Sequence, residues 1–294
     1  MIDAQAVLLP IAIFASMIGI GVELELRQFR VVVEKPLIPV LGTLVHTLTF
    51  PVLAIILVTA VTTFDLPLSE PLLIGILLVA ACPSGGFSNI LVLVARADLV
   101  LSVVLTTLSS LLSFFTVPAL VLLFGLLLPA VSGTVAIPVG ETLLQLFFLV
   151  LLPVVGGMLW RGLQPAFVIP NVGRIQRWTQ VFLYVVIVVV LVQRSDEIMP
   201  VLPSAMPWAV GLCFAALFTG FVVSKLVGLT DTDAATVAIE GSIRNLAVAF
   251  LIAANVLGRV DVAVLPSVYF GAVLIVGFGF AHFWRRRSAR SRDA

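Results

Sequence analysis

The chain alternates long apolar runs with short polar connections, and this pattern predicts an all-α polytopic membrane protein. A helix needs roughly 20 apolar residues to cross a bilayer. Cutting the 294 residues at charges and at Pro/Gly clusters gives nine such segments. They run at about 5–25, 37–61, 70–95, 99–129, 141–161, 176–193, 207–228, 234–256 and 262–284. The runs are continuous rather than alternating, which argues against the strands of a membrane barrel.

Two of these segments are interrupted by residues that oppose a lipid-facing helix. The third carries "CPSGGFSN" at 82–89, and the eighth carries "EGSIRN" at 240–245. Freed backbone groups in a bilayer must find partners inside the protein. Each interruption lies in the next-to-last span of its half, if the halves are spans one to four and five to nine. Paired interruptions indicate a transporter binding site, and the count of four and five suggests an inverted repeat that has lost its first helix.

The composition indicates a membrane protein and limits the classes of partner that we expect. The chain is 61% hydrophobic and 11% charged, against about 45–50% and about 25% in soluble domains. The tail "FWRRRSARSRDA" is the one basic block, so we expect no nucleic-acid partner. The first apolar run has no Lys or Arg before it, and we expect a retained span rather than a cleaved signal peptide. Nothing in the sequence points to an organic cofactor or an obligate protein partner.

The distribution of Lys and Arg predicts the orientation in the membrane. The odd-numbered connections and the C-terminal tail carry Arg27, Arg30, Lys35, Arg96, Arg161, Arg174, Arg177, Lys225, Arg285, Arg286, Arg287, Arg290 and Arg292. The even-numbered connections carry only Arg194 and Arg259. Positive charge favours the cytoplasmic side. We therefore expect an integral membrane protein, in a bacterial inner membrane, with the N-terminus outside and the C-terminus in the cytoplasm.

Glu240 and Arg244 are charges inside the eighth span, where a charge is costly and indicates function by default. They lie four residues apart, on one helix face if the helix is continuous there. One interpretation is a structural ion pair that joins helices. The other is an ion site, because Gly241, Ser242 and Asn245 place backbone and polar side chains around the two charges.

Further polar residues lie in neighbouring spans. Ser88, Asn89, Ser102 and Thr106 offer hydroxyl and amide oxygens, hard ligands that suit Na⁺, although such groups also bond across membrane helices. His46, in "GTLVHTLTFP", is read as a packing residue, with a proton relay as the alternative. His46 and Ser88 together leave open a remote alternative, an intramembrane hydrolase. Glu23 and Glu25 are interpreted as an interfacial charge cluster.

Three stretches resemble the bile acid:sodium symporter family, and its bacterial members in particular. "CPSGGFSNILVLVARADLVLSVVLTTLSSLLSFFTVP" is similar to the family's central signature, "GVELELRQFRVVVEKPLIPVLGTLVHTLTFP" to two earlier helices, and "AIEGSIRNLAVA" to its Glu-x-Gly-x-Gln-Asn motif. The resemblance implies one membrane domain over 1–294 with two crossing broken helices. It implies a panel of helices at about 5–25, 141–161 and 176–193, and a core at about 37–129 and 207–284.

The resemblance also assigns roles to individual residues. The first sodium site would consist of Ser88, Asn89, Ser102, Thr106 and Glu240. The residues that would face the substrate are Asn245, Ser84, Gly85, Gly86 and Phe87. At the family's second sodium site this chain has Arg244 and His46 where glutamines are usual. Arginine stays charged, so we expect Arg244 to replace the second Na⁺ and leave one sodium site.

The expected function is that of a secondary transporter, not an enzyme. A small organic anion would move together with Na⁺ by alternating access. The resemblance favours 2-oxo acids or pantoate-like acids over bile acids. Proton-coupled or uncoupled anion transport is the alternative, and a receptor is disfavoured because no loop is long enough for a signalling domain.

Overall fold

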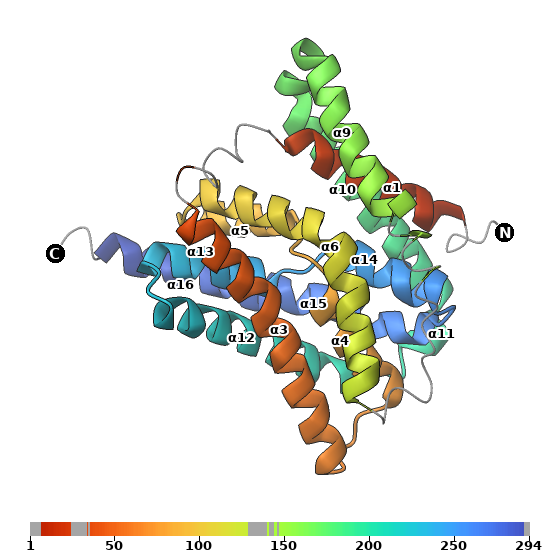
Figure 1. The fold of residues 1–294 in the computed structure, drawn as a ribbon. Coiled ribbons are helices and arrows are strands. Elements are labelled where there is room, and N and C mark those ends of the chain that lie inside the picture. The colour runs from red at the N-terminus through yellow and green to blue at the C-terminus, as the bar shows by residue number, and fades with distance from the viewer. Residues whose placement is uncertain are drawn as a thin grey trace.

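The computed structural model describes residues 7–24, 34, 36–128, 140, 144, 145 and 147–290. Regular secondary structure within these residues is helical throughout, which confirms the predicted all-α class (Figure 1). In the described part of the chain, four stretches are long and apolar enough to cross a membrane: α3 (Leu37–Thr63), α6 (Leu99–Leu127), α12 (Leu202–Leu226) and Asp261–Ser288. Several predicted positions lie outside the described residues: 5, 6, 25–30, 35, 129, 141–143, 146 and 292.

The two predicted interruptions are present as breaks between short helices. The third span consists of α4 (Glu70–Ala81) and α5 (Phe87–Ala95), separated by extended backbone. The eighth consists of α13 (Asp231–Ser242) and α14 (Leu246–Phe250), which continues as the π-helix η3 (Leu251–Val256). Glu240 therefore belongs to the last turns of α13, and Ser88 and Asn89 to the first turn of α5.

Two spans are longer than their predicted boundaries. Helix α10 (Pro165–Gln193) begins well before residue 176, because Pro165 suits the first turn and the arginines that marked the boundary lie on the exposed side of a continuing helix. The last span comprises η4 (Val260–Ala263), α15 (Val264–Ala272), η5 (Val273–Gly277) and α16 (Phe278–Arg290). Charges mark where a helix leaves lipid, not where it ends.

Helix α1 (Leu9–Glu23) packs on α9 (Leu152–Leu163) and α10. These three helices form a group that projects from the rest of the molecule, at the top right of Figure 1. The short helices η2 (Phe147–Leu151) and α11 (Ser195–Ile198) flank α9 and α10 in the chain. A Cβ at Gly21 would lie 2.2 Å from the Val154 carbonyl oxygen, and one at Gly157 would lie 2.5 Å from that of Ile18. Glycine at both positions lets α1 and α9 approach this closely.

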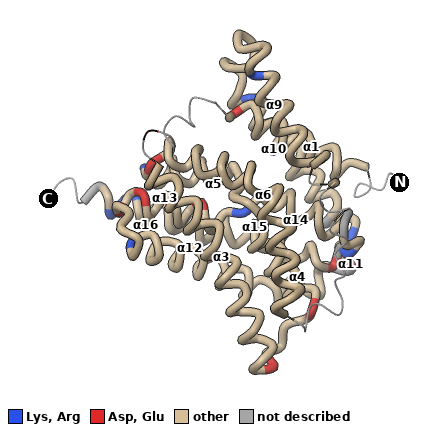
Figure 2. The backbone as a smooth tube through the Cα atoms, viewed as in Figure 1, with Lys and Arg blue, Asp and Glu red and all other residues tan. Residues whose placement is uncertain are grey.

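The remaining helices form a second, larger bundle. Helix α13 packs against α3 and α12, α4 packs against α3 and α15, and α5 packs against α6 and α16. Charged residues gather at the helix ends, with few in the interior (Figure 2). This arrangement places the two breaks in the interior, between the bundle's own helices and the group formed by α1, α9 and α10.

Candidate ion and substrate site

The two breaks cross and satisfy each other's backbone. The Gly85 N–H donates to the Ile243 carbonyl at 3.0 Å, and the Asn245 N–H donates to the Pro83 carbonyl at 2.8 Å. A Cβ at Gly85 would meet the Arg244 carbonyl oxygen at 3.0 Å, so a glycine allows the close approach. The groups freed by each break are thus paired inside the protein, as a bilayer requires.

Glu240 lies beside this crossing, fully buried and surrounded by hydroxyls. Its Oε1 accepts hydrogen bonds from Ser88 at 2.6 Å and from Ser102, and its Oε2 accepts from Thr106 at 2.9 Å and from Ser84. These donors come from the first break, from α5 and from α6. The structure therefore brings three of the predicted oxygen donors to the carboxylate and adds Ser84 as a fourth.

Asn89 extends this cluster toward α1 and α10. Its Oδ1 accepts from the Ser102 hydroxyl at 2.7 Å, and its Nδ2 donates to Glu23 Oε1 at 3.2 Å. Glu23 Oε2 in turn accepts from Gln176 Nε2 at 2.5 Å. A chain of polar contacts thus runs from the buried Glu240 to the group formed by α1, α9 and α10.

Arg244 is 5% exposed and binds backbone carbonyls. Its Nη1 donates to Cys82 O at 3.0 Å, its Nη2 donates to His46 O at 2.8 Å, and its guanidinium carbon lies 4.7 Å from the Phe50 ring centroid. The helix ends at Ser242, so Arg244 does not share a helical face with Glu240. The ion-pair interpretation is therefore replaced by a cation held by carbonyl dipoles and an aromatic ring.

His46 is 1% exposed, and among the described residues its two ring nitrogens have no hydrogen-bond partner. The backbone of His46 lies close to α13, because Gly241 leaves room: a Cβ there would meet His46 Cβ at 3.3 Å. The two predicted members of the second ion site, Arg244 and His46, are therefore in contact, through a carbonyl rather than the imidazole. The Ser88 hydroxyl donates to Glu240 and not to His46, so the pair that a hydrolase needs does not form.

A pocket opens at the crossing. Gly85, Gly86, Phe87 and Asn245 line it together with Arg244. The facing wall comes from α1 and α10 and consists of Ile20, Gln180, Leu183 and Tyr184. Four of the five residues predicted to face the substrate line this pocket. The fifth, Ser84, is fully buried and points to Glu240 instead.

Three contributors to the site were not recognised in the sequence. Glu23 was assigned to an interfacial cluster, yet it contacts Asn89. Tyr269 donates its hydroxyl to the Ser242 carbonyl at 2.7 Å, at the end of α13. Phe50 packs on Arg244. For Glu23, the signal in the sequence is a carboxylate at the glycine-rich end of a helix. For Tyr269, it is a rare tyrosine in an apolar span.

Comparison with known proteins identifies this arrangement. Residues 10–201 match the pattern described as the Sodium Bile acid symporter family. The chain belongs to the sodium bile acid symporter family. Members of this family are transporters rather than enzymes, which agrees with the missing Ser88–His46 pair and removes the hydrolase alternative.

Two known relatives align with most of the chain, and a third aligns with about half of it. A probable chloroplastic sodium/metabolite cotransporter of Oryza sativa subsp. japonica is 28% identical over 94% of this chain and 64% of its own length. The ileal sodium/bile acid cotransporter of Homo sapiens is 30% identical over 81% of this chain and 66% of its own length. An uncharacterized sodium-dependent transporter of Bacillus subtilis is 29% identical over 49% of this chain and 41% of its own length. The chain thus spans about two thirds or less of these relatives.

Proposed function

We propose that this protein is a symporter that couples one Na⁺ to one small organic anion. The observation that carries the proposal is the buried Glu240 carboxylate, which accepts hydrogen bonds from four hydroxyl groups. The names of the relatives, which include sodium/metabolite and sodium/bile acid cotransporters, support the coupling ion and the organic substrate.

The oxygen atoms around Glu240 are suitable ligands for Na⁺ in number and chemical type. The hydroxyls of Ser88, Ser102 and Thr106 and the Asn89 side-chain oxygen converge with the carboxylate, and hard oxygen ligands suit a hard cation. A buried carboxylate without a counter-ion is costly in a membrane. We assign the transported Na⁺ to this cluster, where it would neutralise Glu240.

The anion would bind in the pocket at the crossing. Gly86 and Phe87 begin α5 and line that pocket, and the N-terminal end of a helix carries partial positive charge that attracts a carboxylate. Arg244 adds a full positive charge to the same lining, and Asn245 adds an amide. We propose a small monocarboxylate, of the 2-oxo acid or pantoate type, as the substrate.

Transport would proceed by movement of one helix group against the other. We propose that α1, α9 and α10 form the panel and that the larger bundle forms the core. The pocket lies between them, since its walls come from both groups. The distribution of Lys and Arg supports an orientation with the C-terminus in the cytoplasm of a bacterial cell.

Arg244 sets the proposed stoichiometry. Its guanidinium occupies the place where relatives are expected to bind a second Na⁺, and an arginine in such surroundings stays charged. A fixed charge cannot be carried across the membrane with each cycle. One Na⁺ and one monovalent anion would then move together without net charge.

The sodium dependence of thermal stability tests the proposal. A ligand that binds only the folded state stabilises it by RT ln(1 + [L]/Kd), about 2.7 kcal/mol at 100 Kd. We expect a higher thermal midpoint in NaCl than in choline chloride, and no difference in Glu240→Gln. Sodium-driven uptake of radiolabelled carboxylates into proteoliposomes would complete the test. Uptake that follows a pH gradient and ignores Na⁺ would replace this proposal with proton coupling.

A further inference from the structure

A second cavity lies away from the crossing, between α12 and α16. It is a groove of about 1180 Å³, counting the space on its open side, and its lining comprises Phe214, Leu217, Phe218, Phe221, Val276, Gly279, Phe280, Phe283, Trp284 and Arg287. Nine of these ten residues are apolar or glycine, and the tenth is a cation. Phe214, Phe218 and Phe283 are 63%, 62% and 59% exposed. This groove is therefore open to the surrounding hydrocarbon along its length.

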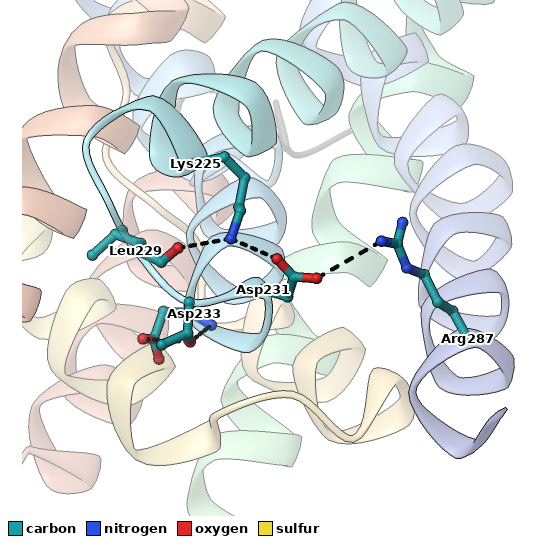
Figure 3. Close-up of polar contacts among 6 residues, drawn as sticks. Lys225, Leu229, Asp231, Asp233 and Arg287 are labelled. Carbon is teal, nitrogen blue, oxygen red and sulfur yellow. Dashed lines mark hydrogen bonds and ion pairs between the residues drawn. The ribbon is translucent and has the colours of Figure 1, made fainter. Parts of the chain in front are cut away.

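The charged end of the groove is only loosely neutralised. Arg287 Nη2 lies 3.7 Å from Asp231 Oδ2, while Lys225 Nζ lies 2.5 Å from Asp231 Oδ1, as Figure 3 shows. The hydrogen bond from Lys225 lowers the pKa of the Asp231 carboxyl, so this carboxylate is ionised at neutral pH and held mainly by the lysine. The Arg287 side chain is 56% exposed, and Arg285 and Arg286 are exposed beside it. A net positive charge therefore remains at this end.

Trp284 supplies an independent polar group in the groove. Its side chain is 3% exposed, and its indole N–H has no hydrogen-bond partner among the described residues. Its ring stacks with Phe280 at a centroid distance of 6.3 Å and lies 5.6 Å from the Arg287 guanidinium carbon. The aromatic groove thus ends at a cation that contacts the Trp284 ring, within one turn of the same helix.

We propose that this groove binds an anionic glycerophospholipid of the membrane. An acyl chain lies between α12 and α16 against the phenylalanine side chains, and the phosphate binds Arg287. Basic residues at the end of a transmembrane helix attract anionic lipids, with each Arg near the surface contributing about fivefold in binding.

Binding of lipid to the purified full chain tests the proposal. We would titrate dioleoyl phosphatidylglycerol or dioleoyl phosphatidylcholine into protein in a neutral maltoside detergent and follow the thermal midpoint. We expect phosphatidylglycerol to stabilise the wild type at lower concentration than phosphatidylcholine does. In Arg287→Gln the apparent affinity for phosphatidylglycerol falls about fivefold, while that for phosphatidylcholine, whose headgroup has no net charge, falls less.

Two further variants distinguish binding of the lipid headgroup from binding of the acyl chain. A Cβ at Gly279 would meet nothing within 4 Å, so Gly279→Leu places a side chain in the groove and weakens binding of both lipids. Arg177→Gln removes an exposed arginine on α10 and serves as the charge-matched control. Glycerol 3-phosphate alone, which has no acyl chain, gives no stabilisation.

The proposal is overturned if the two lipids stabilise the wild type equally, or if Arg177→Gln loses as much as Arg287→Gln. Stabilisation by glycerol 3-phosphate at the concentration that suffices for the lipid would show a free-phosphate site instead. Phosphatidylglycerol retained in native mass spectra of the wild type but not of Gly279→Leu would be direct support. None of these readouts depends on Na⁺ or on transport.

Discussion

The Asn89 side-chain amide donates to Glu23 at 3.2 Å, and this contact joins the hydroxyl cluster around Glu240 to helix α1. The Asn89 oxygen simultaneously accepts from Ser102. The Asn89 side chain therefore contacts both the proposed cation site and helix α1 of the neighbouring group. If Na⁺ binds at this cluster as proposed, the Asn89 amide would link occupancy of the cation site to the position of α1.

Glu23→Gln should weaken this link and leave the cation site intact. A hydrogen bond to a charged group contributes about 1.5–3 kcal/mol. Glutamine keeps one acceptor oxygen, so one of the two bonds becomes a weaker neutral one and the other is replaced by an amide NH2 facing a donor. We expect a lower thermal midpoint and slower uptake, with the sodium-induced stabilisation retained. Loss of the sodium response in Glu23→Gln would instead make Glu23 part of the cation site.

Arg244→Gln should change the charge carried in each cycle. In the wild type we expect initial uptake of a monovalent carboxylate to be insensitive to a potassium diffusion potential of about 100 mV, which acts with about 2.3 kcal/mol per charge moved. A glutamine restores the residue usual at the second ion site, so uptake becomes faster at inside-negative potential. Arg177→Gln, on the surface of α10, should behave like the wild type. Electrogenic uptake by the wild type would exclude the role proposed for Arg244.

Gly157→Ala should destabilise the contact between α1 and α9. The added Cβ would lie 2.5 Å from the Ile18 carbonyl oxygen, well inside contact distance, and overpacking of this kind costs about 1–3 kcal/mol. Gly156→Ala is a matched control one residue away, since a Cβ there meets nothing within 4 Å. Thermal melts of the two variants in the same detergent compare them directly. Equal melting temperatures would contradict the close approach.

Tyr269→Phe should loosen the end of α13. The hydroxyl donates to the Ser242 carbonyl at 2.7 Å, and its removal leaves a buried acceptor without that bond, at a cost of about 1 kcal/mol. We expect a lower thermal midpoint and weaker sodium stabilisation, because Glu240 lies in the same last turns of α13. Tyr184→Phe, in a ring that stacks on Phe270 at 4.8 Å, should leave the sodium response in place.

Sequence patterns predicted the helical class and both interruptions, and the family resemblance grouped Ser88, Ser102 and Thr106 with Glu240. These features depend on local chemistry: a proline or glycine run cannot continue a helix, and a buried carboxylate needs oxygen or cationic partners. The sequence could not predict that Ser84 turns toward Glu240 or that Glu23 reaches Asn89. Both contacts depend on which helices cross, and no local propensity encodes a contact between residues this far apart in the chain.

The start of α10 is a second feature that the sequence pattern did not predict. Arg174 and Arg177 lie at the predicted start of the apolar segment, near residue 176, although the helix runs through them from Pro165. Hydropathy measures where a helix meets lipid, while hydrogen bonding decides where it begins. Similarly, the spacing of Glu240 and Arg244 predicted a shared face, and the break at Ile243 removed it.

The crossing of the two breaks has a mechanical consequence. Each break supplies the backbone partners that the other lacks, through Gly85 with Ile243 and Asn245 with Pro83. Separating the two broken segments would leave these backbone amides and carbonyls unpaired in a medium without water. In the proposed mechanism the crossing would therefore move as one unit with its bundle, and the site would change sides only when α1, α9 and α10 move relative to that bundle.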